Sequence, residues 1–213
     1  MKTDELVALL AAGESAVNPH AVERRYALAL SFGLPLAGLL MATLLKLRPD
    51  LSEAVLLPAF WIKAGFVASL AGAALFAVLR LSRPGARLDR VPALLAAPVL
   101  VIWSLAAYAL FDAPPQQRSA LFFGTTWKGC PLVIAVLSVP LFAGVMWAMK
   151  GLAPTHTRFA GFAAGLLSGA SAALIYSLHC PEMAMPFIGF WYLLGILIPA
   201  VVGTLLSNRL LRW

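Results

Sequence analysis

Long apolar runs separated by short polar breaks make up most of this chain. A helix needs about 20 apolar residues to cross a membrane, because a rise of ~1.5 Å per residue must span roughly 30 Å of hydrocarbon. The hydropathy pattern predicts such spans at residues 26–45, 60–79, 91–111, 131–149, 159–178 and 186–206. We therefore predict an all-α, integral membrane six-helix bundle with short loops and a short cytoplasmic N-terminal tail.

The composition supports this class. Of 213 residues, 62% are hydrophobic and 12% are charged, whereas soluble domains are about half apolar and about a quarter charged. The apolar run after Arg25 ends in "KLRPD" without a small-residue cleavage site, so we expect it to remain as a span and not to be removed as a signal peptide. The chain is divided accordingly into a cytoplasmic tail, residues 1–25, and a six-span transmembrane domain, residues 26–213.

The distribution of positive charge predicts the orientation in the membrane. The net charge is +7, and short cytoplasmic loops are known to collect Lys and Arg. If the N-terminus lies inside, the inner segments hold eleven of the 16 Lys and Arg residues. This favours an orientation with both termini in the cytoplasm. No basic run is interleaved with aromatic residues, so the lipid bilayer is the expected partner and nucleic acid is not.

The only two cysteines are predicted to lie at the outer ends of spans. Cys130 precedes the fourth span, and Cys180 lies in the loop between the fifth and the sixth. Both should therefore share one membrane depth, on the face that is oxidising in bacteria. Spacing alone leaves three interpretations open: a thiol sensor, a permanent disulfide, or two unrelated buried thiols.

Two further candidate ligands flank Cys180 in "SLHCPEMAMPF". Imidazole, thiolate and carboxylate groups are all accepted ligands of zinc, and thiolates also bind softer metal ions. Cys130, Cys180, His179 and Glu182 thus form a candidate metal site, although His179 and Glu182 are equally well interpreted as solvated loop residues. No obligatory cofactor is expected.

Two features inside the spans have structural interpretations. Lys63, in "FWIKAGF", lies near the outer end of the second span, and we interpret it as a lysine that snorkels toward water beside Trp61. Gly161, Gly165 and Gly169 recur every four residues in the fifth span, which favours close packing against another helix of the same chain.

Missing motifs limit the functions that fit. None of the nine acidic residues falls inside a predicted span, whereas ion-coupled carriers usually keep an ionisable group there. The chain has no HExxH, GxSxG or Walker motif, so it is not expected to be an enzyme. A thiol oxidoreductase would need a closely spaced dithiol and a cofactor site. A small membrane carrier or channel for a metal or an apolar solute stays open as the alternative, with the glycine-rich span as its pore wall.

The tail contains a pattern typical of a short amphipathic helix. In "TDELVALLAAGES", Thr3 is placed as an N-cap and Gly13 as a C-terminal stop. Acidic side chains fill the first turn and leucines share one face, which suits a protein partner better than an anionic membrane. A solvated tail without a partner is the other interpretation. The candidate partner-binding residues are Asp4, Glu5, Leu6, Leu9 and Leu10.

Several motifs together resemble one known family. They are the start "MKTDELVALLAAG", then "LRPDL", "FWIKAG", "RPG", "GTTWKGC" and "HCPEMAMPFIGFWYLLGI" in a six-span chain. This pattern resembles, over nearly the whole chain, the NrsF-type family, negative regulators of an extracytoplasmic-function sigma factor.

The resemblance implies an inner-membrane anti-sigma factor without enzymatic activity. It would hold its sigma factor on the cytoplasmic side and release it when heavy-metal or oxidative stress acts on two outward-facing cysteines, positions that Cys130 and Cys180 match. A heavy-metal ion bound transiently at these cysteines is the cofactor it suggests. The chain lacks the HxxxCxxC zinc signature of soluble anti-sigma domains, so we expect binding through the tail and the inner loops.

Overall fold

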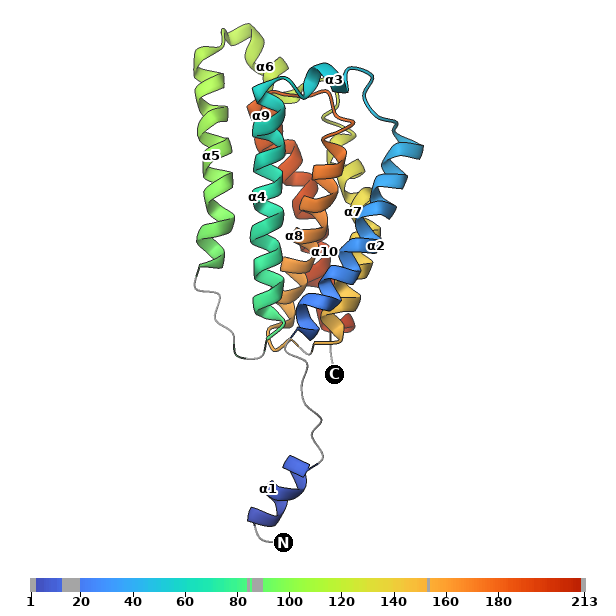
Figure 1. Ribbon diagram of the computed structural model, residues 1–213. Coiled ribbons are helices and arrows are strands. Elements are labelled where there is room, and N and C mark those ends of the chain that lie inside the picture. Colours follow the sequence, from blue (N-terminus) through green and yellow to red (C-terminus); the bar gives the residue numbers. More distant parts are fainter. Residues whose placement is uncertain (1–2, 13–19, 84, 86–89, 153, 212–213) are drawn as a thin grey trace.

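The computed structural model describes residues 3–12, 20–83, 85, 90–152 and 154–211, and it is entirely helical in its regular structure there (Figure 1). Within these residues six helices are long and apolar enough to cross a membrane, which confirms the predicted fold class. They are α2 (Ala21–Leu44), α4 (Pro58–Leu81), α5 (Val91–Asp112), α7 (Cys130–Lys150), α8 (Thr157–Tyr176) and the continuous helix formed by α9 (Met185–Phe187), η1 (Ile188–Tyr192) and α10 (Leu193–Leu210).

Proline sets where many of these helices begin. Its fixed φ suits the first turn of a helix, where the missing N–H costs no hydrogen bond. Pro58, Pro92, Pro131 and Pro186 stand in the first turn of α4, α5, α7 and α9. The first span begins at Ala21, earlier than the predicted residue 26.

Two short helices lie in the loops between spans. The first loop contains α3 (Leu51–Ala54), and the predicted long loop 112–130 contains α6 (Pro115–Phe123). Figure 1 shows both at the same end of the bundle, opposite the end where α2 begins and α10 ends. We call these two ends the cysteine end and the tail end.

Helix α8 forms the centre of the bundle, with α4, α7 and α10 packed around it. Its most apolar window is 78% buried. A β-carbon added at Gly161, Gly165 or Gly169 would collide with backbone carbonyls of α10, which are those of Gly203, Pro199 and Ile196. The absence of side chains there lets the two backbones approach closely. The predicted packing of the glycine face within the chain is therefore confirmed.

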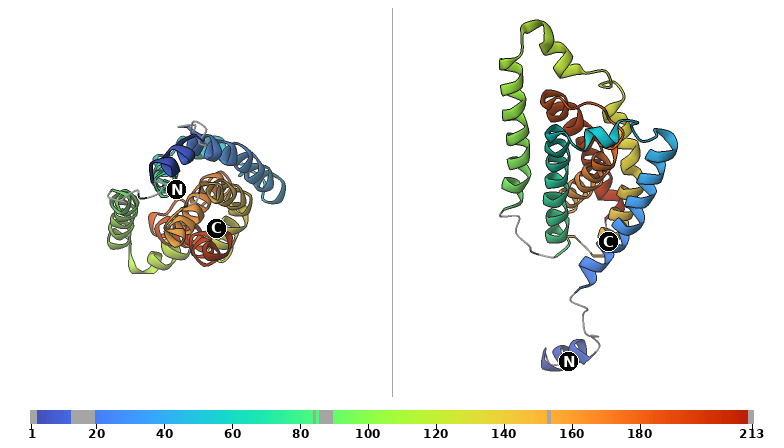
Figure 2. Two further views of the ribbon diagram at one scale, coloured as in Figure 1. Left: turned by 90° about the horizontal axis from the view of Figure 1, so that it is seen from below. Right: turned by 45° about the horizontal axis from the view of Figure 1, so that its top comes forward.

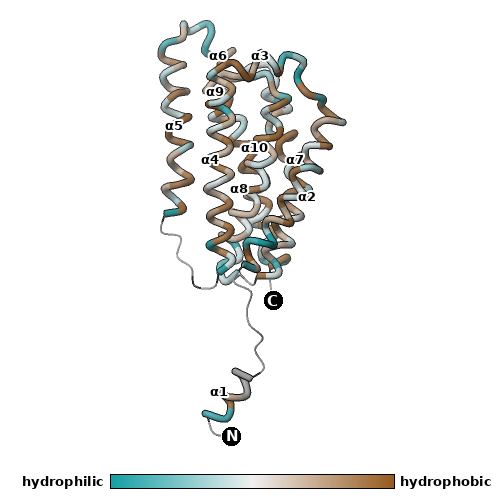
Figure 3. The backbone as a smooth tube through the Cα atoms, viewed as in Figure 1, coloured by the Kyte–Doolittle hydropathy of each residue, from teal (hydrophilic) through white to brown (hydrophobic). Residues whose placement is uncertain are grey.

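Helix α5 lies at the edge of the bundle (Figure 2), and only 6% of its most apolar window is buried. The indole Nε1 of Trp103 donates a hydrogen bond to the carbonyl of Gly189 at 2.9 Å, which fastens α5 to η1. Figure 3 shows apolar residues along the helices and polar residues at both ends of the bundle, the pattern of a chain surrounded by hydrocarbon.

The tail forms the predicted helix, α1 (Thr3–Ala12). Thr3 is its first helical residue, not its cap, and Gly13 lies outside the described residues. Asp4, Glu5 and Leu6 are exposed, whereas the side chains of Leu9 and Leu10 are not described. The partner-binding role of α1, and the division into a tail and a transmembrane domain, stay predictions.

Substitution of Gly165 by alanine tests the packing of α8 against α10. The added methyl group would meet the backbone of Pro199 and Ala200, and such overpacking costs about 1–3 kcal/mol. The matched control is Gly72→Ala, where no atom lies within 4 Å of the added carbon; it should be neutral or stabilising by about 0.5–1 kcal/mol. Unfolding in detergent measures both, and equal midpoints would contradict this packing.

Candidate functional site

Both cysteines lie at the cysteine end of the bundle, as predicted. Cys130 is the first residue of α7, and Cys180 lies in the segment of residues 177–184 that joins α8 to α9, here called the cysteine loop. Both are free thiols with 0% exposure. The two cysteines therefore share one end of the bundle, as expected, but their sulfurs are closed off from solvent in this conformation.

Two tyrosines lie near both thiols. The hydroxyl of Tyr176, on α8, interacts with both Cys130 and Cys180, and Tyr192, on η1, also interacts with both. The two tyrosine rings lie 5.7 Å apart. These four side chains form what we call the thiol pocket. Its existence distinguishes the cysteines from two unrelated buried thiols.

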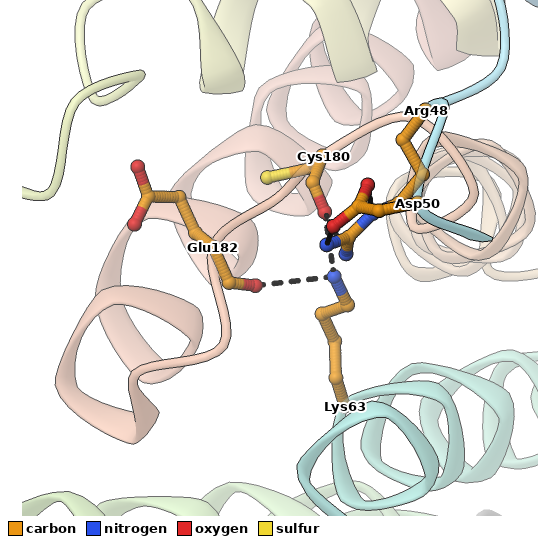
Figure 4. Close-up of polar contacts among 5 residues, drawn as sticks. All are labelled: Arg48, Asp50, Lys63, Cys180 and Glu182. Carbon is orange, nitrogen blue, oxygen red and sulfur yellow. Dashed lines mark hydrogen bonds and ion pairs between the residues drawn. The ribbon is translucent and has the colours of Figure 1, made fainter. Parts of the chain in front are cut away.

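Lys63 is buried beside this pocket, with 0% exposure. Its ammonium donates hydrogen bonds to the carbonyls of Cys180, at 2.9 Å, and Glu182, at 3.1 Å (Figure 4). It also lies 5.9 Å from the ring centroid of Tyr192. The snorkelling interpretation was wrong, because the side chain turns inward to these carbonyls. A lysine within an apolar span is itself a signal of a functional site.

Arg48 holds the cysteine loop from the first loop of the chain. Its Nη1 lies 3.5 Å from the carbonyl of Cys180, and its backbone N–H donates to the carbonyl of Leu178 at 3.4 Å. The guanidinium also donates two hydrogen bonds to the carboxylate of Asp50, at 2.8 and 2.6 Å. These bonds hold the pKa of Asp50 below its usual value. The pair therefore stabilises the fold above the usual pKa of aspartate and loses this effect as pH falls through the lowered one.

His179 and Glu182 fasten the loop and do not turn to the sulfurs. The Nδ1 of His179 donates to the carbonyl of Lys46 at 2.7 Å. The Glu182 carboxylate accepts hydrogen bonds from the backbone N–H and hydroxyl of Thr125, both at 2.7 Å, and Figure 4 shows it pointing away from Lys63. Among the residues that the structure describes, no three His, Cys, Asp or Glu side chains are grouped to hold a metal. The predicted four-residue metal site is not assembled in this state.

Gly124 makes the contact of Glu182 with the α6–α7 loop possible. Its φ is +53°, a left-handed conformation that favours glycine. A β-carbon there would lie 2.6 Å from the Glu182 carboxylate. The motif "GTTWKGC" thus combines the glycine that admits Glu182, the Thr125 that binds it, and Cys130 of the thiol pocket.

Helix α4 connects this site with the tail end of the bundle. Just after α4, the hydroxyl of Ser82 donates its single hydrogen to the carbonyl of Val78. The Ser82 oxygen is therefore the acceptor in its hydrogen bond with Tyr26 of α2, at 2.8 Å. Nearby, Arg83 pairs with Glu23 of α2 at 2.8 Å. The helix that bonds to the cysteine loop at one end is thereby joined at the other to the start of α2, which the tail precedes.

A family model described as negative regulator of sigma F, NrsF, matches residues 10–213. The chain belongs to the NrsF family. This confirms the resemblance seen in the sequence motifs, and the description of the family is that of a regulator.

Two relatives match this NrsF-family chain over its full length and theirs. The chain is 61% identical to a protein of Azospira oryzae described as a probable anti-sigma-F factor NrsF. It is 40% identical to the anti-sigma-F factor NrsF of Caulobacter vibrioides. No solved structure matches the chain.

Replacement of Lys63 by methionine tests the hold of α4 on the cysteine loop. The variant keeps the apolar length of the side chain and removes both hydrogen bonds to loop carbonyls. A hydrogen bond to a charged group contributes about 1.5–3 kcal/mol, so Cys180 should react with a maleimide at least about tenfold faster as the loop opens.

The matched control for this experiment is Lys128→Met, a change of the same chemistry at an exposed position near the same end. It should react at the rate of the unmodified chain. If Lys63→Met also leaves the rate unchanged, the ammonium does not restrain the loop.

Proposed function

We propose that this NrsF-family protein is an anti-sigma factor of the bacterial inner membrane. It holds an extracytoplasmic-function sigma factor at the cytoplasmic face and releases it when a heavy metal or an oxidant acts on Cys130 and Cys180. The match to the family and the description of both relatives as anti-sigma-F factors support the sigma-factor partner. The single observation that supports sensing is the pair of free thiols enclosed in one pocket.

The tail end of the bundle faces the cytoplasm in this proposal. The excess of Lys and Arg in the segments at that end supports this orientation. The cysteine end then faces the periplasm, where thiols are oxidised. An oxidant or a metal ion from outside would meet the cysteines there before it reached the cytoplasm.

The sigma factor binds α1 together with the basic loops at the tail end. The described acidic residues of α1, Asp4 and Glu5, are exposed, and so is 43% of Leu6. An exposed helix with an acidic turn and apolar side chains fits a groove on a protein partner. The basic residues Arg80, Arg83 and Arg158 are exposed at the same end of the bundle, with Arg83 paired to Glu23.

Sensing begins in the cysteine loop. Both thiols must lose a proton to bind a soft cation, and a disulfide would require the two Cα atoms to come within about 7 Å. Either event repositions Cys180 relative to Cys130 at the start of α7. Because Lys63 is bonded to the carbonyls of Cys180 and Glu182, a shift of the loop acts directly on α4.

Helix α4 passes the change to the tail end. Its far end is bonded to α2 through Ser82 and Tyr26, so displacement of α4 moves the start of α2 and alters the surface that holds the partner. A coupling free energy of about 1–3 kcal/mol is enough to weaken an affinity about 5–150-fold.

The carrier or channel alternative receives no support from the packing of α8. Its glycine face, the expected pore wall, is filled by the backbone of α10. A carrier would change the uptake of labelled metal into vesicles that contain no soluble partner, and this measurement distinguishes it from an anti-sigma factor.

Serine in place of both cysteines tests the sensor. Cys130→Ser with Cys180→Ser should abolish the rise of sigma-dependent transcription that cadmium causes, because serine does not bind soft metals or form disulfides. The control Lys128→Met should keep the response, since Lys128 is exposed near the same end and does not hold the cysteine loop. An unchanged response in the double variant would remove the thiols as the sensor.

Deletion of residues 2–14 tests the partner contact. The sigma factor should then leave the membrane fraction, since the helix that we assign to its binding is lost. Glu53→Gln, a change at an exposed acid of the cysteine end, is the control and should retain it. Full recovery of the sigma factor with the deleted protein would rule out α1 as an essential contact.

A further inference from the structure

The hydroxyl of Tyr192 is the one buried side-chain polar atom without a hydrogen-bond partner among the described residues. The whole side chain has 0% exposure. Buried hydroxyl groups are almost always bonded, because an unmet donor loses its hydrogen bond to water without compensation. Such a group in a packed interior calls for a physical explanation.

The position of Tyr192 is set by an unusual turn of helix. It is the last residue of the π-helical segment η1 (Ile188–Tyr192), and π-turns inside α-helices occur frequently at functional sites. The ring packs against Tyr176 and Phe187, with centroids 5.7 and 6.5 Å away. The apolar ring is thus well accommodated, and only the hydroxyl is left without a bond.

The hydroxyl is close to the two sulfurs. The Lys63 nitrogen that bonds to the Cys180 carbonyl at 2.9 Å lies 5.9 Å from the centroid of the Tyr192 ring, which places that ring beside Cys180. Tyr192 interacts electrostatically with both cysteines, and its hydroxyl has no partner in hydrogen-bond geometry. A neutral thiol is a weak acceptor, whereas a thiolate is a strong one, because charge-assisted hydrogen bonds are about twice as strong as neutral ones. The Tyr192 hydroxyl has no hydrogen bond beside a neutral thiol, but it would donate one to a thiolate.

Resting on the proposed function, we propose that Tyr192 is a positioning residue of the sensor, whose hydroxyl donates to the Cys180 sulfur when that sulfur is the thiolate ligand of a thiophilic divalent cation. Two S–H bonds break, two bonds from sulfur to the cation form, and two protons leave to solvent. The resting state lacks this hydrogen bond and the occupied state has it. Only contacts that differ between two states can shift their equilibrium, and Tyr192 supplies one.

Tyr176, whose ring lies 5.7 Å from that of Tyr192, also interacts with both cysteines. Tyr176 comes from α8, whereas Tyr192 comes from η1. The side chains near the sulfurs are thus the two tyrosines and not the predicted ligands His179 and Glu182, which are bonded elsewhere.

Removal of the hydroxyl alone tests this proposal. Tyr192→Phe keeps the ring and its packing, and Tyr108→Phe, on the 72% exposed side chain of Tyr108 in α5, is the matched control. The probe is cadmium, bound at equilibrium to the intact detergent-solubilised protein. Loss of an outer-shell partner typically costs 10–100-fold in metal affinity, so Tyr192→Phe should raise the cadmium Kd about tenfold or more, while Tyr108→Phe should leave it unchanged.

Thermal unfolding without metal separates this role from a structural one. The midpoint of Tyr192→Phe should equal or exceed that of the unmodified chain, because the variant removes an unsatisfied buried donor. Tyr176→Phe is the second variant and should also weaken cadmium binding.

A cadmium Kd for Tyr192→Phe equal to that of the unmodified protein would overturn the role of Tyr192. The proposed function itself would fail if cadmium bound the variant with Cys130→Ser and Cys180→Ser as tightly as it binds the unmodified protein. Both outcomes are measured by cadmium titration but on different variants, so failure of the Tyr192 role and failure of the proposed function are distinguishable.

Discussion

The buried ammonium of Lys63 is the interaction on which the cysteine end of this protein depends. Taking such a group out of water carries an effective penalty of several kcal/mol, which only well-placed acceptors offset. Here the acceptors are the carbonyls of Cys180 and Glu182. The chain thereby fixes a loop without regular structure against a membrane-spanning helix, because either partner alone would leave a buried polar group unmet.

The same constraint explains how a reactive loop remains ordered. Arg48, Thr125 and Lys46 bond to it from segments far apart in the sequence, so each of its polar residues has a partner other than water. The cysteines are buried at the centre of this arrangement. Their enclosure makes opening of the loop a condition for reaction. In the function that we propose, the thiols therefore respond only to ligands that stabilise an opened or rearranged loop.

The rest of the bundle differs in how firmly it is packed. Helix α8 is locked to α10 by backbone contact along its glycine face, while α5 is joined to the bundle mainly through α4, Trp103 and the region of η1. In a bilayer helix association relies on such close packing, since the lipid supplies no hydrophobic driving force between helices. Helix α4 packs against α8. It is bonded to the cysteine loop through Lys63 and, through Ser82 just beyond its other end, to Tyr26 near the start of α2.

The sequence by itself determined the number of spans, the shared end of the two cysteines and the internal packing of Gly161, Gly165 and Gly169, because these follow from apolar length, from alternating direction and from helical spacing. It did not determine where Lys63, His179 or Glu182 point. Each is bonded to a residue from a distant segment, and several partners were equally available to it in the sequence. Only the tertiary structure, which brings the first loop, the α6–α7 loop and η1 around the cysteine loop, decided those contacts and placed the hydroxyl of Tyr192 beside the sulfurs without a bond.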